Sequence, residues 1–532
     1  MHGFDLLRDP WIPTQRLDGG IEELSLLDTL QQAHDLLAVV EESPIVVFAL
    51  YRFLVTVCYW HVGLREEQAW SAAWQRGHLT DHDLQRVEEE CSGRMGLFDP
   101  DRPFLQDALA ALSKGEQRSG PPSVAYLFPD LPSGSSSSHF MHGGEKTYAI
   151  CPACCAKGLL ALPPFAVPAG GGPRAFRYSI NGKPPVYVMP VGKTLFATIL
   201  LNTPRPQWRP EPPAEGDHGP TWVWVDTIGE QEERHGDVGL AVGLTWPVRR
   251  IRLIPGPGAD CSRCGNSSDV LVRGMAHFQG WYRSDEAALW RDPWVTFVTF
   301  GEKGPLPLRP RADRATWRDF DALFLSAGKH ESARIVEQTA SLIDDGEVCE
   351  TSCVGFQTFA LRNEEGRQAA KIVEWRRGTF RFPLVLLHNP VAARAVEEAL
   401  AEAEKVEKWL HEALQQLDPA TERKRTNRQQ SREAMRTLRN STSHWFWDDL
   451  EPVFREMLNS QRLQGDSHAL AAWTREWLAA VHNRGWTAIE QVLTDFIYSA
   501  EALRAAENAR ATFAGLTAPL RAKIRPEEVV SQ

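Results

Sequence analysis

Cys151-Pro152-Ala153-Cys154 and Cys261-Ser262-Arg263-Cys264 are two short stretches that each hold a pair of cysteines. Such a pair can direct two thiolates at one cation, and four thiolates complete the tetrahedral shell that Zn²⁺ prefers. A shell closed by four sulfurs leaves no position for water or substrate, so the pattern indicates a structural zinc site. About a hundred residues separate the two pairs, against about 15–20 in an ordinary zinc ribbon, so the ion would join distant segments.

The alternatives for these cysteines are two disulfides, or small buried thiols without a metal. Nothing in the sequence indicates export, and thiols stay reduced in the cytosol, so disulfides are disfavoured. Cys155 lies next to the first pair and could replace a ligand in a distorted site. We expect the other cysteines to be ordinary core thiols: Cys58, Cys91, Cys349 and Cys353.

Size and composition set the broad class of the protein. A chain of 532 residues exceeds the length at which one core stops growing, so at least two domains are expected. The net charge of −11 argues against a protein coated with nucleic acid, but it allows local basic grooves. Residues 1–11 lack the pattern of a signal peptide, which favours a cytoplasmic location. The most apolar run, 44–60, is short for a membrane span and contains Arg52, so we expect a buried helix and no membrane role.

Residues 1–380 mix short helical patterns with proline-rich and glycine-rich connections. Few segments hold one hydrophobic period for long, which is typical of an irregular mixed α/β domain. The expected helices are 24–38, 45–61 and 81–91, and the expected strands are 186–190, 222–225, 248–253 and 295–300.

The sequence pattern becomes that of long amphipathic helices after Phe382-Pro383. Asn389 can cap a long helix that begins with Pro390, and apolar residues then recur three or four positions apart as far as Leu417. Further helices are expected at 422–438, 444–458, 467–482 and 486–508, joined by short connections. The fold class is therefore α+β: a large irregular α/β domain (1–380) with the Cys₄ zinc site, and a C-terminal four-helix bundle (385–532) with one extra helical piece.

The second helix of this C-terminal region carries a stripe of arginines, which we call the arginine stripe: Arg425, Arg428, Arg432, Arg436 and Arg439. Their spacing places the guanidiniums on one helix face, where like charges repel unless an anion crosses them. A nucleic-acid backbone is the obvious anion. The alternative is a solvated face that the glutamates of the preceding helix neutralise in part: Glu397, Glu404 and Glu407.

Two further segments carry flexible compositions on either side of the first cysteine pair. Residues 134–138 are glycine and serine, and Phe140-Met141-His142 follow them. Gly170-Gly171-Gly172 lies after the pair. A bound metal would anchor the base of both loops. The alternatives are a disordered linker for the first segment and a plain turn for the second.

Together these features resemble the large subunit of the type I-E CRISPR surveillance complex Cascade, the CasA family. The likeness is carried by the order of short motifs: Leu6-Leu7-Arg8-Asp9-Pro10-Trp11-Ile12-Pro13, Pro103-Phe104-Leu105-Gln106, the first cysteine pair, the glycine loop, Gly243-Leu244-Thr245-Trp246, the second pair and the helical C-terminus. No single motif is specific, but their order and spacing are.

The resemblance implies a subunit that performs no reaction. It would read the short duplex motif beside the target (the PAM), promote strand separation and R-loop formation, and recruit a helicase-nuclease. Gly170–Gly172 would match the family's glycine loop in the minor groove, and Gln368 the glutamine wedge. Phe140-Met141-His142 would match the loop that contacts the 5′ end of the CRISPR RNA and neighbouring Cascade subunits.

One element departs from the family pattern. The family's lysine finger should follow the second cysteine pair, yet 279–283 reads Gln-Gly-Trp-Tyr-Arg. Arg283 or Gln279 would have to serve instead.

The competing interpretations are a zinc-stabilised nucleic-acid-processing enzyme and a pure protein scaffold. The sequence has no H-E-x-x-H, no phosphate-binding G-x-x-x-x-G-K-[ST] and no G-x-S-x-G. Asp344-Asp345 precedes a glycine and is most simply a turn, and Asp81-His82-Asp83 is explained about as well by a capped helix start as by a metal-binding fragment.

Overall fold

The computed structural model describes residues 3–129, 131, 148–168, 176–210, 212, 216–230, 232–234, 236–283, 290–299, 304–325, 330–365, 370–417, 428–494 and 500–524, with backbone alone at 365, 370, 371 and 428–432. The chain forms two compact units. Unit 1 contains Met1–Pro310 and Glu331–Thr379, and unit 2 contains Arg311–His330 and Phe380–Gln532.

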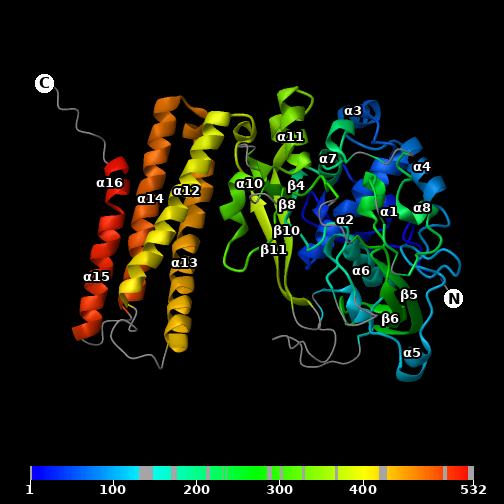
Figure 1. The fold of residues 1–532 in the computed structure, drawn as a ribbon. Coiled ribbons are helices and arrows are strands. Elements are labelled where there is room, and N and C mark those ends of the chain that lie inside the picture. The colour runs from blue at the N-terminus through cyan, green and yellow to red at the C-terminus, as the bar shows by residue number, and fades with distance from the viewer. Residues whose placement is uncertain are drawn as a thin grey trace. The chain divides into compact units, whose positions relative to one another are not determined.

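A buried helix lies at the centre of unit 1 (Figure 1). Helix α2 (Pro44–Val57) continues into the π-helical turn η1 (Cys58–Val62), and every residue of α2 after Pro44 is buried. The stretch Pro44–Val62 is long and apolar enough to cross a membrane by composition alone, but 94% of its apolar window is buried inside the structure. The expected core helix is therefore confirmed. It packs against α6 (Pro152–Phe165).

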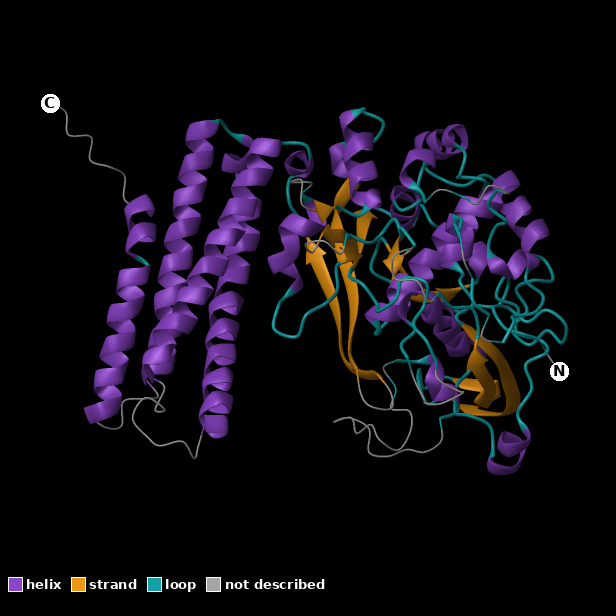
Figure 2. Cartoon of the chain, in the orientation of Figure 1, coloured by secondary structure: helices purple, strands orange, loops and turns teal. Residues whose placement is uncertain are grey.

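The strands of unit 1 form small sheets instead of one large layer (Figure 2). Strands β1 (Ile12–Arg16), β2 (Ile21–Leu24) and β3 (Leu36–Val39) form an antiparallel sheet in the order β2-β1-β3. A second sheet has the order β11-β10-β4 and contains β4 (Tyr187–Gly192), β10 (Cys353–Glu365) and β11 (Ala370–Phe380). Short strands elsewhere are β7 (Phe297–Thr299), β8 (Pro305–Pro307) and β9 (His330–Glu331).

The longest hairpin joins β5 (Arg249–Asp260) to β6 (Ser267–Gln279) in antiparallel register. Because its tip holds the second cysteine pair, this hairpin carries half of the expected metal site to the first pair. The remaining helices of unit 1 are α1 (Leu26–Gln31), α3 (Glu67–Arg76), α4 (Asp81–Cys91), α5 (Lys114–Ser119), η2 (Val124–Leu127), α7 (Leu195–Leu201), η4 (Pro206–Trp208), α8 (Thr221–Trp224), α9 (Leu240–Leu244), α11 (Arg334–Asp344) and η7 (Glu350–Ser352).

Two local predictions for unit 1 are wrong. The helix expected over 24–38 ends at Gln31, and Leu36–Val39 is instead strand β3, because this segment pairs with β1. The strand expected over 222–225 is the single helical turn α8. There the hydroxyl of Thr245 accepts a 2.8 Å hydrogen bond from the amide of Thr221, so a tertiary contact overrides the β-propensity of the segment.

Long helices dominate unit 2, where α12–α15 lie side by side (Figure 1). The helices are α12 (Pro390–Leu414), η9 (Gln415–Leu417), α13 (Arg428–Leu458), α14 (Ser467–Thr494), α15 (Ala500–Leu516) and α16 (Ala518–Ile524), with short turns at η8 (Leu384–Leu387) and η11 (Gln461–Gln464). Asn389 caps α12 as expected, because its side chain accepts 3.1 Å hydrogen bonds from the amides of Val391 and Ala392.

The breaks expected near 438–444 and 482–486 do not exist, because α13 and α14 each run through them. In α13, the Thr442 hydroxyl donates to the carbonyl of Leu438, so a polar residue is accommodated inside the helix. In α14, a Cβ on Gly485 would lie 2.9 Å from Phe513 of α15. The glycine therefore allows close helix packing and does not end the helix.

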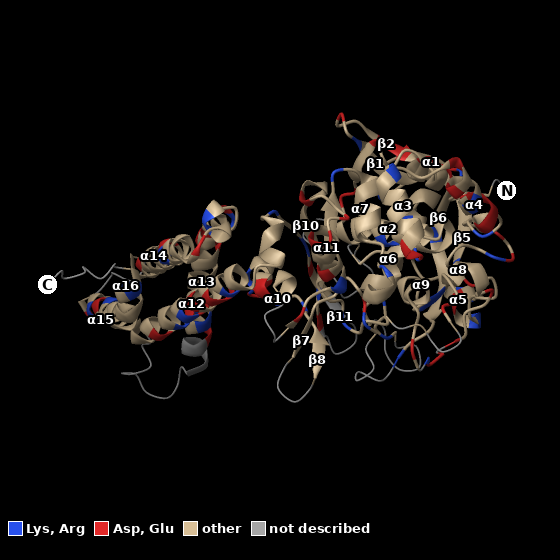
Figure 3. Cartoon of the chain, turned by 90° about the horizontal axis from the view of Figure 1, so that it is seen from above, with Lys and Arg blue, Asp and Glu red and all other residues tan. Residues whose placement is uncertain are grey.

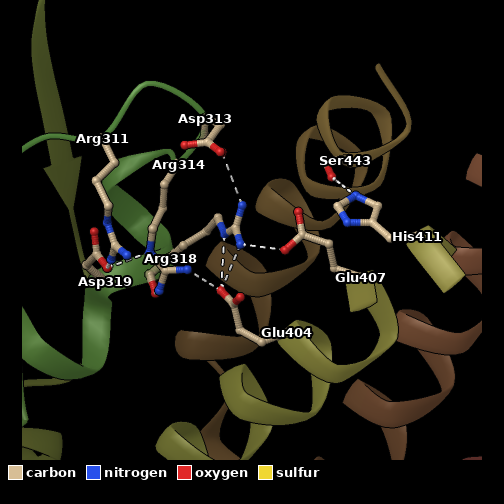
Figure 4. A network of polar contacts seen from close by, with 9 residues as sticks. All are labelled: Arg311, Asp313, Arg314, Arg318, Asp319, Glu404, Glu407, His411 and Ser443. Atoms are coloured by element: carbon tan, nitrogen blue, oxygen red, sulfur yellow. Dashed lines mark hydrogen bonds and ion pairs between the residues drawn. The ribbon is translucent and has the colours of Figure 1, made fainter. Parts of the chain in front are cut away.

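Residues Arg311–His330 belong to unit 2, which the sequence did not predict. They include η6 (Thr316–Asp319) and α10 (Phe320–Phe324). Two kinds of contact hold them there. The ring of Phe320 lies 5.5 Å from that of Phe454 on α13, and Arg318 forms 2.9 Å ion pairs with Glu404 and Glu407 on α12 (Figure 4).

Candidate functional site

The four predicted metal ligands come together in unit 1. Cys151 is the N-cap of α6 and Cys154 lies in its first turn, whereas Cys261 and Cys264 lie in the turn between β5 and β6. Their four Sγ atoms all lie within 4.8 Å of one another. The Sγ atoms of Cys151 and Cys264 are 3.8 Å apart.

Backbone pairing holds the two segments in this position. Ile150 and Val272 exchange hydrogen bonds of 2.9 and 2.8 Å, which adds the segment before α6 to the edge of β6. The amide of Ser262 donates to the carbonyl of Ala149 at 2.8 Å. Gly265 completes the turn with a φ of +76°, a conformation that suits glycine.

The donor set fits one tetrahedral cation. Zn–S bonds of about 2.3 Å place neighbouring sulfurs about 3.8 Å apart, close to the Cys151–Cys264 separation. A hydrogen bond from Cys154 lowers the pKa of the Cys264 thiol to about 7. The pKa of Cys154 is raised instead, chiefly through its hydrogen bond with Cys151, because four crowded thiols cannot all ionise without a cation.

The other cysteines separate clearly from this cluster. All nine are free thiols, so the disulfide alternative is not what the structure shows. Cys155 is fully buried and its thiol points to the carbonyl of Ile150, 3.8 Å away, so it is not a member of the four-sulfur cluster. Cys58, Cys91 and Cys353 are buried as expected. Cys349 is exposed, so its assignment as a core thiol is wrong: it follows α11 at the surface, where its thiol contacts the Thr351 hydroxyl at 3.3 Å.

Three groups of predicted contact residues fall outside the described part of the chain. These are the glycine loop Gly170, Gly171 and Gly172, the wedge Gln368, and the loop Phe140, Met141 and His142. Their flanking residues are described. Tyr148 and Ile150 lead directly into the metal cluster, and β10 and β11 flank 366–369.

The two ends of the glycine-loop segment are held by one buried guanidinium. Arg249, at the start of β5, donates to the carbonyl of Val167 at 2.8 Å and to the carbonyl of Arg177 at 3.0 Å. Its guanidinium also lies 4.8 Å from the ring centroid of Phe176. Burial lowers the pKa of Arg249 to about 9. The base of the segment 168–176 is therefore closed by a residue that the prediction did not name.

Gln279 reinforces this closure from β6. Its side-chain oxygen accepts a 2.6 Å hydrogen bond from the amide of Arg177, and its amide nitrogen donates to the carbonyl of Val248 at 3.0 Å. Only 4% of Gln279 is exposed. Its side chain is engaged inside the fold, which favours Arg283 over Gln279 for the place of the lysine finger. Arg283 is half-buried and donates to the carbonyl of Gly236 at 2.8 Å.

The sequence did contain a signal for Arg249. Arg249, Ile251 and Leu253 are buried and lie on the same face of β5, whereas the residues between them are partly exposed. The alternation of strand side chains therefore predicts that Arg249 points into the core. Buried arginines are rare, so this position could have been singled out as a structural or functional residue.

The arginine stripe is described only in part. Arg425 lies outside the described residues, and Arg428 and Arg432 are described by their helical backbone alone. Arg436 is exposed and Arg439 is half-buried on α13, and no described carboxylate forms an ion pair with either. Figure 3 shows acidic and basic residues interspersed along the helices of this unit.

Two of the three glutamates expected to neutralise the stripe have other partners. Glu404 and Glu407 pair with Arg318, and Glu404 also pairs with Arg314 (Figure 4). The guanidinium of Arg318 lies 3.7 Å from the ring centroid of Trp447. Glu404 and Glu407 therefore neutralise Arg314 and Arg318, and they form no ion pair with Arg436 or Arg439.

Comparison with known proteins gives consistent results. The family model described as CRISPR-associated protein Cse1 matches residues 5–487. The CRISPR-associated protein CasA/Cse1 of Thermus thermophilus is 28% identical over 516 residues, which cover 92% of this chain and 93% of that protein. The crystal structure of Cse1 from Acidimicrobium ferrooxidans has a TM-score of 0.76 at 20% identity and covers 99% of this chain and 100% of that one. A chain of a structure titled CRISPR RNA-guided surveillance complex has a TM-score of 0.73 at 20% identity, with 96% and 99% covered.

Proposed function

The chain belongs to the CRISPR-associated protein Cse1 (CasA) family, and from this premise we propose that it is the large subunit of an RNA-guided surveillance complex, Cascade. The observation that carries the proposal is the family match over nearly the whole chain, from residue 5 to 487. A likeness in fold to a chain of a surveillance complex supports it. The proposed location is the cytoplasm, where guide RNA and invading DNA meet.

Within that complex the subunit reads the PAM in double-stranded target DNA and starts strand separation. Gly170, Gly171 and Gly172 would approach the minor groove, because glycines let backbone come close to base edges. Gln368, between β10 and β11, would act as the wedge that helps R-loop formation. Arg249 and Gln279 support this proposal, because they fix both ends of the glycine-loop segment to the hairpin β5–β6.

The remaining partners follow from the same family role. Phe140, Met141 and His142 would contact the 5′ end of the CRISPR RNA and neighbouring subunits. After R-loop formation the subunit would recruit a helicase-nuclease, so DNA cleavage belongs to that partner and this chain performs no reaction. Arg283 stays the candidate for the place of the lysine finger.

Zn²⁺ is the proposed ion at the four-cysteine cluster. Cys151, Cys154, Cys261 and Cys264 would hold it as a structural centre, because four thiolates complete its shell. The ion would fix the tip of β5–β6 to the start of α6, and this would give the neighbouring loops a rigid base.

In unit 2 we propose that α12, α13, α14 and α15 form the expected four-helix bundle. The arginine stripe on α13 would face a nucleic-acid backbone there. Exposed Arg436 supports this role, because it has no ion-pair partner among the described residues and its guanidinium is available to a phosphate.

The direct test measures the affinity of the assembled complex, loaded with guide RNA, for target duplexes with and without the flanking motif. We expect tight binding only when the motif is present. Omission of this subunit should remove the difference. Equal affinity for both duplexes would favour a protein scaffold, and DNA cleavage by this chain alone would favour a processing enzyme.

A matched pair of glycine variants locates the motif-reading element. Gly171→Asp adds bulk and negative charge to the glycine loop and should abolish motif-dependent binding. Gly115→Asp is the control, because a side chain on this helical glycine would meet only the Ser113 hydroxyl, at 3.8 Å. If both variants bind like the wild type, the glycine loop does not read the motif.

A further inference from the structure

Arg177 leaves the core at the end of the glycine-loop segment. The preceding residue, Phe176, packs inward, with its ring centroid 4.4 Å from that of buried His277. Arg177 itself is exposed. The chain therefore anchors one aromatic side chain and presents the next residue, a cation, to solvent.

The backbone of Arg177 is fixed on both sides. Its amide donates to Gln279 at 2.6 Å, and its carbonyl accepts from Arg249 at 3.0 Å. Both partners are at most 5% exposed and belong to the hairpin β5–β6. An arginine with a backbone fixed in this way loses little backbone freedom when it binds a ligand.

The side chain of Arg177 is also oriented. Its guanidinium lies 4.2 Å from the ring centroid of Tyr282. The tyrosine is held by backbone hydrogen bonds of 3.0 Å from its amide to Glu232 and from the amide of Arg234 to its carbonyl. Stacking on an aromatic ring leaves the edge of a guanidinium open for hydrogen bonds.

The nearby carboxylates are engaged elsewhere. Glu232 pairs with Arg234 at 2.7 Å, and Glu233 accepts a 3.3 Å hydrogen bond from the Tyr282 hydroxyl. No described carboxylate forms an ion pair with Arg177. A fixed, stacked and uncompensated guanidinium is suited to bind an anion, and phosphate geometry matches its planar donors.

We propose that Arg177 contacts a phosphate of the target duplex beside the flanking motif, with Tyr282 as its positioning residue. This inference rests on the proposed function, because the segment that ends at Arg177 is the one expected to approach the groove. A phosphate contact carries charge but no base information. Arg177 therefore contributes affinity, and the glycine loop contributes motif preference.

The test uses the assembled complex with guide RNA and duplexes with and without the motif, over a range of salt concentrations. Arg177→Gln should weaken binding of both duplexes by the same factor, about tenfold, and should reduce the slope of log K against log salt by about 1. Arg177→Lys keeps the charge and should retain the slope. The control is Arg118→Gln, which removes an exposed arginine on α5 that has no described ion-pair partner.

The tyrosine variants separate orientation from charge. Tyr282→Leu removes the ring under Arg177 and should weaken binding a few-fold with the salt slope unchanged, since the cation remains. Tyr282→Phe keeps the ring and should restore wild-type affinity. Melting temperatures of all variants confirm that they are folded.

The outcomes distinguish this inference from the proposed function. A wild-type salt slope for Arg177→Gln, or an equal loss for Arg118→Gln, overturns the role of Arg177 and leaves motif reading intact. If the wild-type complex does not prefer the motif, the proposed function fails whatever the slope.

Discussion

Arg52 on α2 and Asp292 form a 2.8 Å ion pair in the core of unit 1, with side-chain exposures of 4% and 0%. The same carboxylate oxygen accepts a 2.8 Å hydrogen bond from the side chain of Asn181. The guanidinium lies 5.2 Å from the ring centroid of Trp294. This pair explains how a charged residue can occupy the most apolar helix of the chain.

Asp292→Asn should destabilise unit 1 strongly. The change keeps the shape of the side chain but leaves the charge of Arg52 buried without a counterion, a loss of about 3–5 kcal/mol. Urea unfolding measures the change in the free energy of unfolding. Asp101→Asn, at an exposed position without a described ion pair, is the control and should stay within about 0.5 kcal/mol of the wild type.

Cys154→Ala should remove the bound metal, whereas Cys155→Ala should retain it. Both residues are buried neighbours on α6, but only Cys154 belongs to the four-sulfur cluster. Elemental analysis should find about one zinc per chain in the wild type and in Cys155→Ala. The melting temperature should fall further for Cys154→Ala, because lost metal affinity is lost folding free energy. Equal metal content in the two variants would contradict the site.

Glu404→Gln should destabilise unit 2 by about 1.5–3 kcal/mol at neutral pH, because Arg318 and Arg314 lose a charged acceptor. Glu397→Gln is the control on the same helix, since no described cation pairs with Glu397. Chemical unfolding followed by far-UV circular dichroism, to which the long helices of unit 2 contribute, measures the difference.

The same variant should show a defined pH dependence. Burial alone would raise the pKa of Glu404, but Arg318 and Arg314 outweigh burial, so the folded-state pKa lies below its usual value. The stabilisation by this carboxylate is therefore complete above the unfolded pKa of about 4.3 and is lost as the pH falls through the folded pKa. The stability gap between wild type and Glu404→Gln should narrow below about pH 4. A gap that is constant down to acid pH would exclude this assignment.

Arg436→Glu should weaken capture of target DNA and reduce the salt slope by about 1 or more. Arg436 is exposed on α13 without a described counterion. Arg504→Glu, on α15, reverses an equally exposed arginine outside the stripe and should bind like the wild type. An unchanged salt slope for Arg436→Glu would favour the alternative interpretation, in which the arginine stripe is a solvated helix face.

Features that depend on local pattern could be predicted from the amino-acid sequence. The spacing of Cys151, Cys154, Cys261 and Cys264 identified the cluster, because each pair is a short-range motif. Asn389-Pro390 located the start of α12 for the same reason, since capping is a local hydrogen-bonding effect. The order of short motifs along the chain identified the family.

Features that depend on partners far away in the sequence could not be predicted in this way. Leu36–Val39 became a strand because β1 was available, and Gly485 stayed helical because Phe513 packs against it. Arg311–His330 joined unit 2 through Arg318 and its glutamates. Arg249 and Gln279 hold the ends of the glycine-loop segment through hydrogen bonds to residues that are 72 to 102 positions away in the sequence. Local propensity is too weak to fix such contacts, because packing and buried hydrogen bonds between remote segments outweigh it.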